Sequence, residues 1–385
     1  MQLLIIKNIE NMKFNVSSSA LLSALQSLSK VIASKNTLPI LDSFLFNLEG
    51  EKLTITASDV ETRLVTSLNV VSHEGGGFFA IEAKRLLDPL KELPEQPLTF
   101  SINDDNMAVN VDYENGKFNM PGQKGDTYPQ QKPLKESAVS LTLESQILLN
   151  GLNRAFFATA DDELRPVMNG IYFDIQTECL IFVASDGHKL VRLRNTSIQS
   201  KERASFILPK KPANLLKSLL SKDDDSVNIT FDENNAYVKT SSFEMVCRLI
   251  EGRYPNYDAV IPANNPNLVT IDRMSFLTAL KRVSVFSSQA SGLAKIQLSE
   301  NEMMVSAQDI DFSTSGEEKI VCQYSSVPIS IGFKASYLID ILVNINAENV
   351  VLQLADPSRA GVLVPSENAE NEELLMLLMP MMLND

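Results

Sequence analysis

Apolar residues follow two different spacings along the chain, and the spacing changes at intervals. Between residues 21 and 32, leucine and isoleucine recur every three or four positions, which predicts an amphipathic helix with one buried face. Apolar residues at 44–48 and 53–57 instead alternate with polar ones, and the polar stretch 49–52 between them predicts a β-hairpin. Helices are predicted at 17–32, 83–93, 144–158, 210–221, 272–288 and 334–346, with short strands between them.

The same order of elements occurs three times. The sequence at 53–59, which ends in Ala-Ser-Asp, recurs at 180–186 and, less closely, at 303–309. The same shift aligns Lys84 with Lys211 and then with Lys334. A unit this long exceeds the roughly 20–50 residues of a solenoid repeat and indicates three copies of a whole domain. The predicted divisions are an N-terminal extension or misassigned start at 1–11, then domains at 12–130, 131–262 and 263–385.

Charge is distributed unevenly over these elements. The chain has 385 residues, 34 Lys and Arg against 48 Asp and Glu, and a net charge of −14, which argues against a protein that coats DNA generally. The six predicted helices nevertheless hold twelve basic and five acidic residues, so they carry +7 and the remainder carries −21. This pattern predicts a confined basic surface that contacts phosphates, although lysines on an ordinary solvated helix face are the alternative.

Several other classes of protein are disfavoured. Cys179, Cys247 and Cys322 are few and far apart, which is typical of reduced, buried thiols. No apolar run reaches the roughly 18–20 residues of a membrane span, and no signal peptide is recognisable, so a cytoplasmic protein is expected. No phosphate-binding loop, dinucleotide-binding loop or nucleophile elbow occurs, and we expect neither a cofactor nor a metal.

Four motifs in order carry a family resemblance: TLPIL at 37–41, SDGHKL at 185–190, GRYPNY at 252–257 and MPMML at 379–383. Together with the triple repeat they make the chain resemble the bacterial sliding clamp, the beta subunit of DNA polymerase III. The resemblance implies an α+β fold with three repeated DNA-clamp domains, each with two helices lining a central hole and antiparallel sheets outside. It also implies a ring-shaped, head-to-tail homodimer without catalytic activity, which confers processivity.

Simple geometry agrees with two copies per ring. Helices packed about 9 Å apart leave a hole of roughly 7 Å for six helices but about 24 Å for twelve. A duplex is roughly 20 Å across, so one chain cannot encircle it. A closed ring retains DNA by topology and needs only weak, sequence-independent phosphate contacts. The partners implied by the resemblance are duplex DNA, the polymerase III alpha subunit, clamp-loader subunits, and other polymerases and repair proteins that bind through short peptides.

The resemblance also implies three sets of site residues. The DNA-binding set is Lys35, Lys84, Arg85, Arg154, Lys210, Lys211, Lys217, Lys281 and Arg282. The peptide-binding set is Met168, Ser185, Gly187, His188, Lys189, Leu190, Pro255, Val260, Val362, Met379, Pro380 and Met381. The dimer-interface set is Phe118, Met120, Val285 and Phe286, for which ordinary core positions are the alternative.

The chain departs from the family pattern near its end. Met382 and Lys189 stand where the family usually carries arginine, and 384–385 extend beyond the usual terminus, so peptide preference is open. The sequence 379–383 could alternatively be only a last edge strand.

Three rival functions remain open from the residues alone. Ser185, Asp186 and His188 are the residue types of a hydrolase triad, but neighbouring positions on one turn cannot normally form the relay. Acidic clusters at 161–163, 223–225 and 309–311 could serve a metal-dependent nuclease or phosphatase, although the last lacks the Gly and Glu of a calcium loop. The third rival is an acidic adaptor that never contacts DNA.

Overall fold

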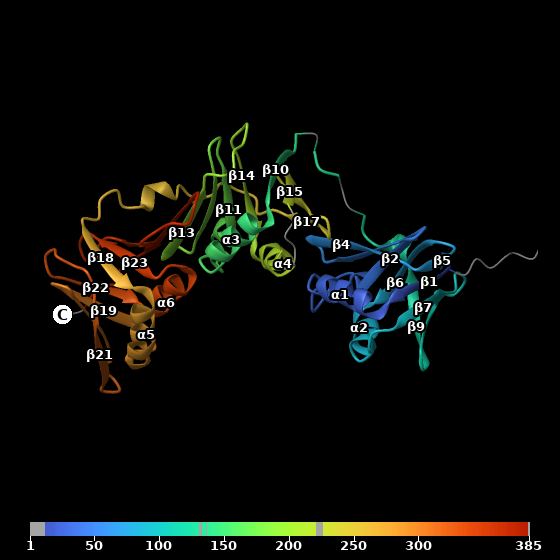
Figure 1. The fold of residues 1–385 in the computed structure, drawn as a ribbon, viewed down its shortest axis with the longest axis horizontal. Helices are drawn as coiled ribbons and strands as arrows, with labels where there is room; N and C mark the ends of the chain where they lie inside the picture. Colours follow the sequence, from blue (N-terminus) through green and yellow to red (C-terminus); the bar gives the residue numbers. More distant parts are fainter. Residues whose placement is uncertain (1–11, 131–132, 136, 221–225, 384–385) are drawn as a thin grey trace, which may run out of the picture. The chain divides into compact units, whose positions relative to one another are not determined.

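The computed structural model describes residues 12–130, 133–135, 137–220 and 226–383. The predicted extension 1–11 and the acidic cluster 223–225 lie outside these ranges. The chain divides into two compact units (Figure 1). Unit 1 comprises 1–145 and 218–248, and unit 2 comprises 146–217 and 249–385.

Unit 1 is built on one antiparallel sheet. Among its described residues the sheet has 13 strands in the order β10-β15-β16-β17-β4-β3-β2-β6-β9-β8-β7-β1-β5. The strands are β1 (Met12–Ser17), β2 (Ser43–Glu49), β3 (Lys52–Ser58), β4 (Thr62–Asn69), β5 (Ser72–Glu74), β6 (Gly77–Glu82), β7 (Pro97–Ile102), β8 (Ala108–Tyr113), β9 (Gly116–Lys124), β10 (Val139–Glu144), β15 (Ser226–Phe231), β16 (Asn235–Lys239) and β17 (Glu244–Arg248). Its helices are α1 (Ser18–Ser29) and α2 (Ala83–Lys91), with short 3₁₀ segments η1 (Pro39–Asp42) and η2 (Gly125–Thr127).

Unit 2 contains two antiparallel sheets within its described ranges. Their orders are β14-β11-β12-β13-β25-β24-β23-β18 and β21-β20-β19-β22. The strands are β11 (Gly170–Ile175), β12 (Leu180–Ser185), β13 (Lys189–Asn195), β14 (Ala204–Pro209), β18 (Asn267–Asp272), β19 (Leu293–Ser299), β20 (Glu302–Asp309), β21 (Thr314–Val321), β22 (Ile329–Lys334), β23 (Asn349–Leu354), β24 (Gly361–Pro365) and β25 (Glu372–Leu378). The helices are α5 (Arg273–Val283) and α6 (Ala335–Asn344), with η3 (Pro166–Met168), η4 (Asp258–Val260) and η5 (Ser284–Phe286).

Each of two further helices contains a boundary between the units in its residue range. Helix α3 (Ser145–Phe156) belongs to unit 2 except for its first residue, and α4 (Lys210–Leu220) belongs to unit 2 up to Lys217. No helix within the described ranges is long and apolar enough to cross a membrane.

Apolar spacing accounts for the helices and for the sheet faces that they cover. Leu21, Leu25 and Leu28 of α1 are fully buried, as the spacing of three to four predicts. Ser17 caps this helix by accepting a hydrogen bond from the Ala20 N–H. The predicted hairpin is confirmed as β2 and β3, in which Leu48 lies opposite Leu53.

The helix boundaries correct one predicted correspondence. Strands β6, β14 and β22 each run directly into a helix, so α2, α4 and α6 begin at Ala83, Lys210 and Ala335. Lys84 and Lys211 are therefore the second residues of their helices, whereas Lys334 is the last residue of β22 and the N-cap of α6. The predicted equivalence of Lys334 with the other two lysines was wrong by two positions, because a shift in residue identity ignored where the strand ends.

Candidate functional sites: an apolar groove and the basic residues of the helices

A groove in unit 2 opens beside the ends of strands β12, β13 and β25. It has a volume of about 210 Å³ and is mainly apolar. Its lining residues are Met168, Ser185, Gly187, His188, Lys189, Leu190, Tyr254, Pro255, Asn256, Tyr257, Val260, Leu377 and Met379. A small apolar cleft with a few polar groups is the usual form of a ligand or peptide site.

The structure brings most of the expected peptide-binding residues to this groove and leaves three aside. Val362 is buried in β24 opposite Leu377, so its side chain lies on the same face of the sheet, next to the lining. Pro380 and Met381 follow β25, and the Met381 N–H donates a hydrogen bond of 2.8 Å to the Gly332 carbonyl of β22. Pro380 and Met381 therefore carry the chain away from the lining.

Four lining residues escaped the sequence analysis: Tyr254, Asn256, Tyr257 and Leu377. The first three lie inside the recognised motif 252–257. The tyrosines stand three positions apart on either side of Pro255, a pattern that could have indicated their role. Leu377 sits in an apolar run that reads as an ordinary core strand.

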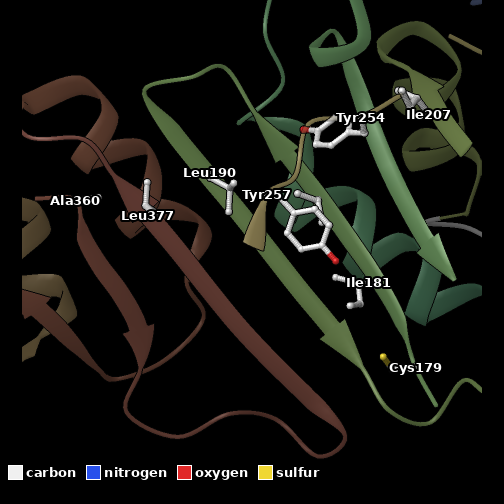
Figure 2. Packing of buried hydrophobic residues seen from close by; sticks show 9 residues of the cluster. Cys179, Ile181, Leu190, Ile207, Tyr254, Tyr257, Ala360 and Leu377 are labelled. Carbon is white, nitrogen blue, oxygen red and sulfur yellow. The ribbon is translucent and has the colours of Figure 1, made fainter. Parts of the chain in front are cut away.

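The groove shares Leu190, Tyr254, Tyr257 and Leu377 with a cluster of buried hydrophobic residues (Figure 2). The Tyr172 and Tyr254 rings stack with centroids 4.7 Å apart. The Tyr257 hydroxyl donates a hydrogen bond of 2.6 Å to Asp174 Oδ2. Burial, followed by the hydrogen bond to Asp174, raises the pKa of Tyr257. Leu190 and Leu377 lie opposite each other on adjacent strands β13 and β25 and extend this apolar floor.

The turn at 185–189 is held by its own backbone rather than arranged as a catalytic triad. Ser185 Oγ donates to the Lys189 carbonyl at 2.9 Å, and Asp186 Oδ1 accepts the N–H groups of His188 and Lys189, each at 2.9 Å. Gly187 adopts φ +90°, a conformation that favours glycine. The serine and the aspartate are thus occupied with the turn, which leaves no serine–histidine relay.

Asp186 and Lys189 form an ion pair beneath the groove. Their side chains are 15% and 7% exposed, and Lys189 Nζ lies 2.7 Å from Asp186 Oδ2. Burial opposes ionisation of the carboxyl, but the hydrogen bonds from the Lys189 ammonium and from two backbone N–H groups outweigh it. The pKa of Asp186 therefore lies below its ordinary value.

The comparisons with known proteins cover almost the whole chain. Family models described as the N-terminal, central and C-terminal domains of the DNA polymerase III beta subunit match residues 12–132, 142–256 and 258–382. The chain belongs to the DNA polymerase III beta subunit family. Its α+β antiparallel fold of three clamp domains agrees with this membership.

Individual relatives agree with the family models. The chain is 28% identical over 375 residues to a beta sliding clamp of Pseudomonas putida, which covers 97% of this chain and 100% of the relative. It is 27% identical over 373 residues to the beta sliding clamp of Haemophilus influenzae, with the same coverage. A solved DnaN sliding clamp of Pseudomonas aeruginosa bound to griselimycin superposes with a TM-score of 0.92 at 26% identity, covering 97% of this chain and 100% of that chain.

The basic residues expected to contact DNA differ in their surroundings. Lys35, Lys84, Lys211 and Lys281 are exposed. Four other members of the set interact with named neighbours: Arg85 lies 2.5 Å from Glu82, Lys210 lies 2.6 Å from Asp161, Lys217 lies over the Phe156 ring at 4.5 Å, and Arg282 donates to Glu318 at 2.9 Å. Burial lowers the pKa of Lys217. Exposure leaves the ammonium groups of Lys35, Lys84, Lys211 and Lys281 accessible to phosphates.

Arg154 has a different environment from the rest of this set. It is half-buried, and its Nη1 donates to the Asn344 carbonyl, the last residue of α6. Arg273 adds bonds of 3.1 Å to the Leu342 carbonyl and 2.8 Å to the Ala347 carbonyl. The last carbonyls of a helix lack intrahelical partners and carry partial negative charge. Arg154 and Arg273 together satisfy this end of α6.

The four residues expected at the dimer interface also divide by exposure. Val285 and Phe286, in η5, are 78% and 41% exposed, which argues against the alternative that they are core. Met120 is buried, and Phe118 is half-buried against the Tyr113 ring at 4.7 Å. The Phe286 ring covers Gly316 of β21 so closely that a Cβ there would lie 2.5 Å from it.

The carboxylates of the described acidic clusters accept hydrogen bonds from nearby groups of the same chain. Asp162 accepts from the Leu164 N–H at 2.8 Å and from Arg165 Nε at 2.7 Å. Asp309 Oδ1 accepts the N–H groups of Asp311 and Phe312 at 3.0 and 3.2 Å. Within the part of the chain that the structure describes, no group of three or more His, Cys, Asp or Glu side chains is arranged to hold a metal ion.

Proposed function

We propose that this chain is a DNA sliding clamp in which exposed lysines contact the duplex and the unit 2 groove holds partner peptides. The observation that carries this conclusion is the match, in order and over nearly the full length, to all three domains of one family. The clamp encircles duplex DNA, tethers the replicative polymerase and confers processivity without catalysing a reaction. Two copies close head to tail into the ring.

Charge explains how such a ring binds DNA without gripping it. A net charge of −14 repels DNA from most of the surface, while a few exposed lysines, on the helices and in the loop between α1 and η1, attract it. We assign the phosphate contacts to Lys35, Lys84, Lys211 and Lys281 first. Because each phosphate contact adds about 0.9 to the salt slope, a small number keeps binding weak and reversible.

The groove supplies the second half of the function. Its lining of methionine, leucine and tyrosine adapts to different apolar side chains, as a site shared by several partners requires. The partners are the polymerase III alpha subunit, clamp-loader subunits, and other polymerases and repair proteins. We expect short peptides to bind with a dissociation constant of about 1 μM, so that partners exchange.

Three further parts of this assignment are proposals. The domain divisions are 12–130, 131–262 and 263–385. The dimer contact joins Phe118 and Met120 of one copy to Val285 and Phe286 of the next. The site of action is the cytoplasm, where bacterial DNA is replicated.

The decisive experiment compares intact and linearised circles. The chain is loaded onto a closed circular plasmid by the clamp loader of the same cell, and half of the sample is then cut at a single site. Because a ring runs off an end, the cut sample should lose the protein while the mock-treated circle retains it. Equal retention on both, or a solution mass of 42.6 kDa rather than twice that value, would refute the ring.

A further inference from the structure

Tyr337 of α6 lies against the side chains of His188, Lys189 and Lys334. The His188 ring stacks on it with centroids 5.9 Å apart. The Lys189 ammonium lies 4.2 Å from the ring centroid, and the Lys334 ammonium lies 4.8 Å from it. A tyrosine ring attracts a cation to its face, but two ammonium groups at one ring also repel each other. The arrangement therefore needs anions to balance it.

The two lysines differ in how their charge is balanced. Lys189 is buried and paired with Asp186 at 2.7 Å. Lys334 is half-buried, and no carboxylate within the described ranges lies within 4.0 Å of its ammonium. Asp340 lies one turn after Tyr337 in α6. Burial raises the pKa of Asp340, while the charge of Lys189 opposes this shift and the charge of Asp186 adds to it.

Lys334 is also connected to the groove through the backbone. The Met379 N–H donates 2.8 Å to the His188 carbonyl, which holds the end of β25 beside the groove. Two residues later, the Met381 N–H donates 2.8 Å to Gly332 of β22. Lys334 follows Gly332 by two positions, on the same face of the strand. The path from the groove thus runs past His188 and Tyr337 to Lys334.

We propose that Lys334 is a specificity-determining residue of the groove and that it binds an acidic side chain flanking the apolar anchor of a docked peptide. The inference rests on the proposed function and deepens it. The groove supplies apolar contact, the buried pair of Asp186 and Lys189 lies at its edge, and Lys334 supplies an ammonium that has no carboxylate within 4.0 Å in the described ranges. Because the ammonium is partly solvated, its preference for Glu over Gln is about two- to five-fold in affinity.

DNA is the competing ligand for this ammonium. Lys334 sits at the end of β22, two positions before the place in α6 that corresponds to Lys84 and Lys211 in their helices. Its contact with Tyr337, which also touches two residues of the groove lining, favours a peptide.

The test uses the full chain and short fluorescent peptides with a leucine and phenylalanine anchor. A single Glu is moved through the flanking positions, and each peptide has a Gln counterpart. Binding is measured by fluorescence anisotropy at about 0.05 M and about 0.5 M salt. At one position the Glu peptide should bind about two- to five-fold more tightly than its counterpart at low salt, and the difference should shrink at high salt.

Matched variants then assign the preference. Lys334→Gln should make the Glu and Gln peptides bind equally while leaving the affinity for the Gln peptide unchanged. Lys201→Gln makes the same change in net charge in the loop beyond the opposite end of β13, and it should keep the preference.

The outcomes separate this inference from the proposed function. If the Gln peptides bind but no Glu position improves binding, or if the preference survives Lys334→Gln, Lys334 does not determine specificity and the groove assignment stands. If Lys334→Gln lowers only the salt slope of DNA binding, the ammonium serves DNA and the inference is overturned. If no peptide binds the wild-type chain, both fail.

Discussion

Arg154 could either contact DNA or cap the end of α6, and one substitution can distinguish these two roles. The structure directs its guanidinium to the Asn344 carbonyl, where Arg273 serves the same end of α6. Helix α6 has no basic residue in its last turn, so these two arginines from other helices supply the positive charge. We therefore expect Arg154→Gln to weaken α6 and to leave the electrostatics of DNA binding unchanged.

The magnitude follows from the contact. A hydrogen bond from a charged donor contributes about 1.5–3 kcal/mol, and the helix end adds about 0.3–1 kcal/mol. Arg154 is half-buried, and water reaches part of the freed carbonyl, so we expect a net loss of about 2 kcal/mol. Burial first, and then repulsion from Arg273, lowers the pKa of Arg154, although Glu372 opposes this. The guanidinium nonetheless stays charged at every working pH.

The measurement is local hydrogen exchange rather than global unfolding, because a chain with two compact units need not unfold in one step. A loss of about 2 kcal/mol corresponds to roughly 30-fold faster exchange of the α6 amides. The matched variant Lys211→Gln should leave this exchange unchanged and reduce the salt slope of DNA binding by about 0.9. If Arg154→Gln instead lowers the slope and spares α6, Arg154 contacts phosphate and the capping role is wrong.

Three further substitutions test other parts of the structure. Lys189→Met should destabilise unit 2 by about 3 kcal/mol near pH 7, because it leaves Asp186 ionised and buried, and the double variant with Asp186→Asn should recover most of the loss in denaturant titrations. Folding lowers the pKa of Asp186. The stabilisation from the ion pair is therefore present above about pH 4, the pKa expected for this carboxyl in the unfolded chain, and is lost as the pH falls further. The Lys189→Met variant should lack this acid dependence. Phe286→Asp should halve the mass measured by light scattering, and an unchanged mass would remove η5 from the interface. Gly151→Ala should lower stability by about 1–2 kcal/mol despite a better helix propensity, because its Cβ would lie 2.5 Å from the Phe182 ring; an increase in melting temperature would contradict this.

Periodicity predicted that the helices exist but not where they end. The predicted helix 272–288 ends as an α-helix at Val283, after which η5 continues as a tighter 3₁₀ turn to Phe286. Apolar spacing continues through both segments, so it cannot distinguish them, whereas the hydrogen-bond pattern does. The shift of Lys334 has the same origin, because the end of β22 is a property of strand pairing and not of residue identity.

The motifs predicted residues that the fold brings together at the groove, whereas the count of basic residues did not predict which of them have partners in their own chain. The motifs at 185–190 and 252–257 converge because a tight turn and a proline fix the backbone locally, and sequence records both. A count of basic residues records no partners. The carbonyl that Arg154 satisfies belongs to Asn344 and is far away in sequence, so only the fold could reveal it.

The two functions of the clamp place opposite demands on charge, and the described residues meet them differently. A lysine that contacts a sliding duplex must stay solvated and exchange partners, as exposed Lys84 and Lys281 can. A groove that binds apolar side chains must pair its buried charges with each other. The free energy needed to bury an unpaired charge exceeds the free energy gained from apolar contact. Asp186 and Lys189 achieve that balance within one turn. Lys334 is half-buried, and within the described ranges no carboxylate of its own chain lies within ion-pair distance. An acidic side chain of a docked peptide would supply the counter-charge that the chain itself does not.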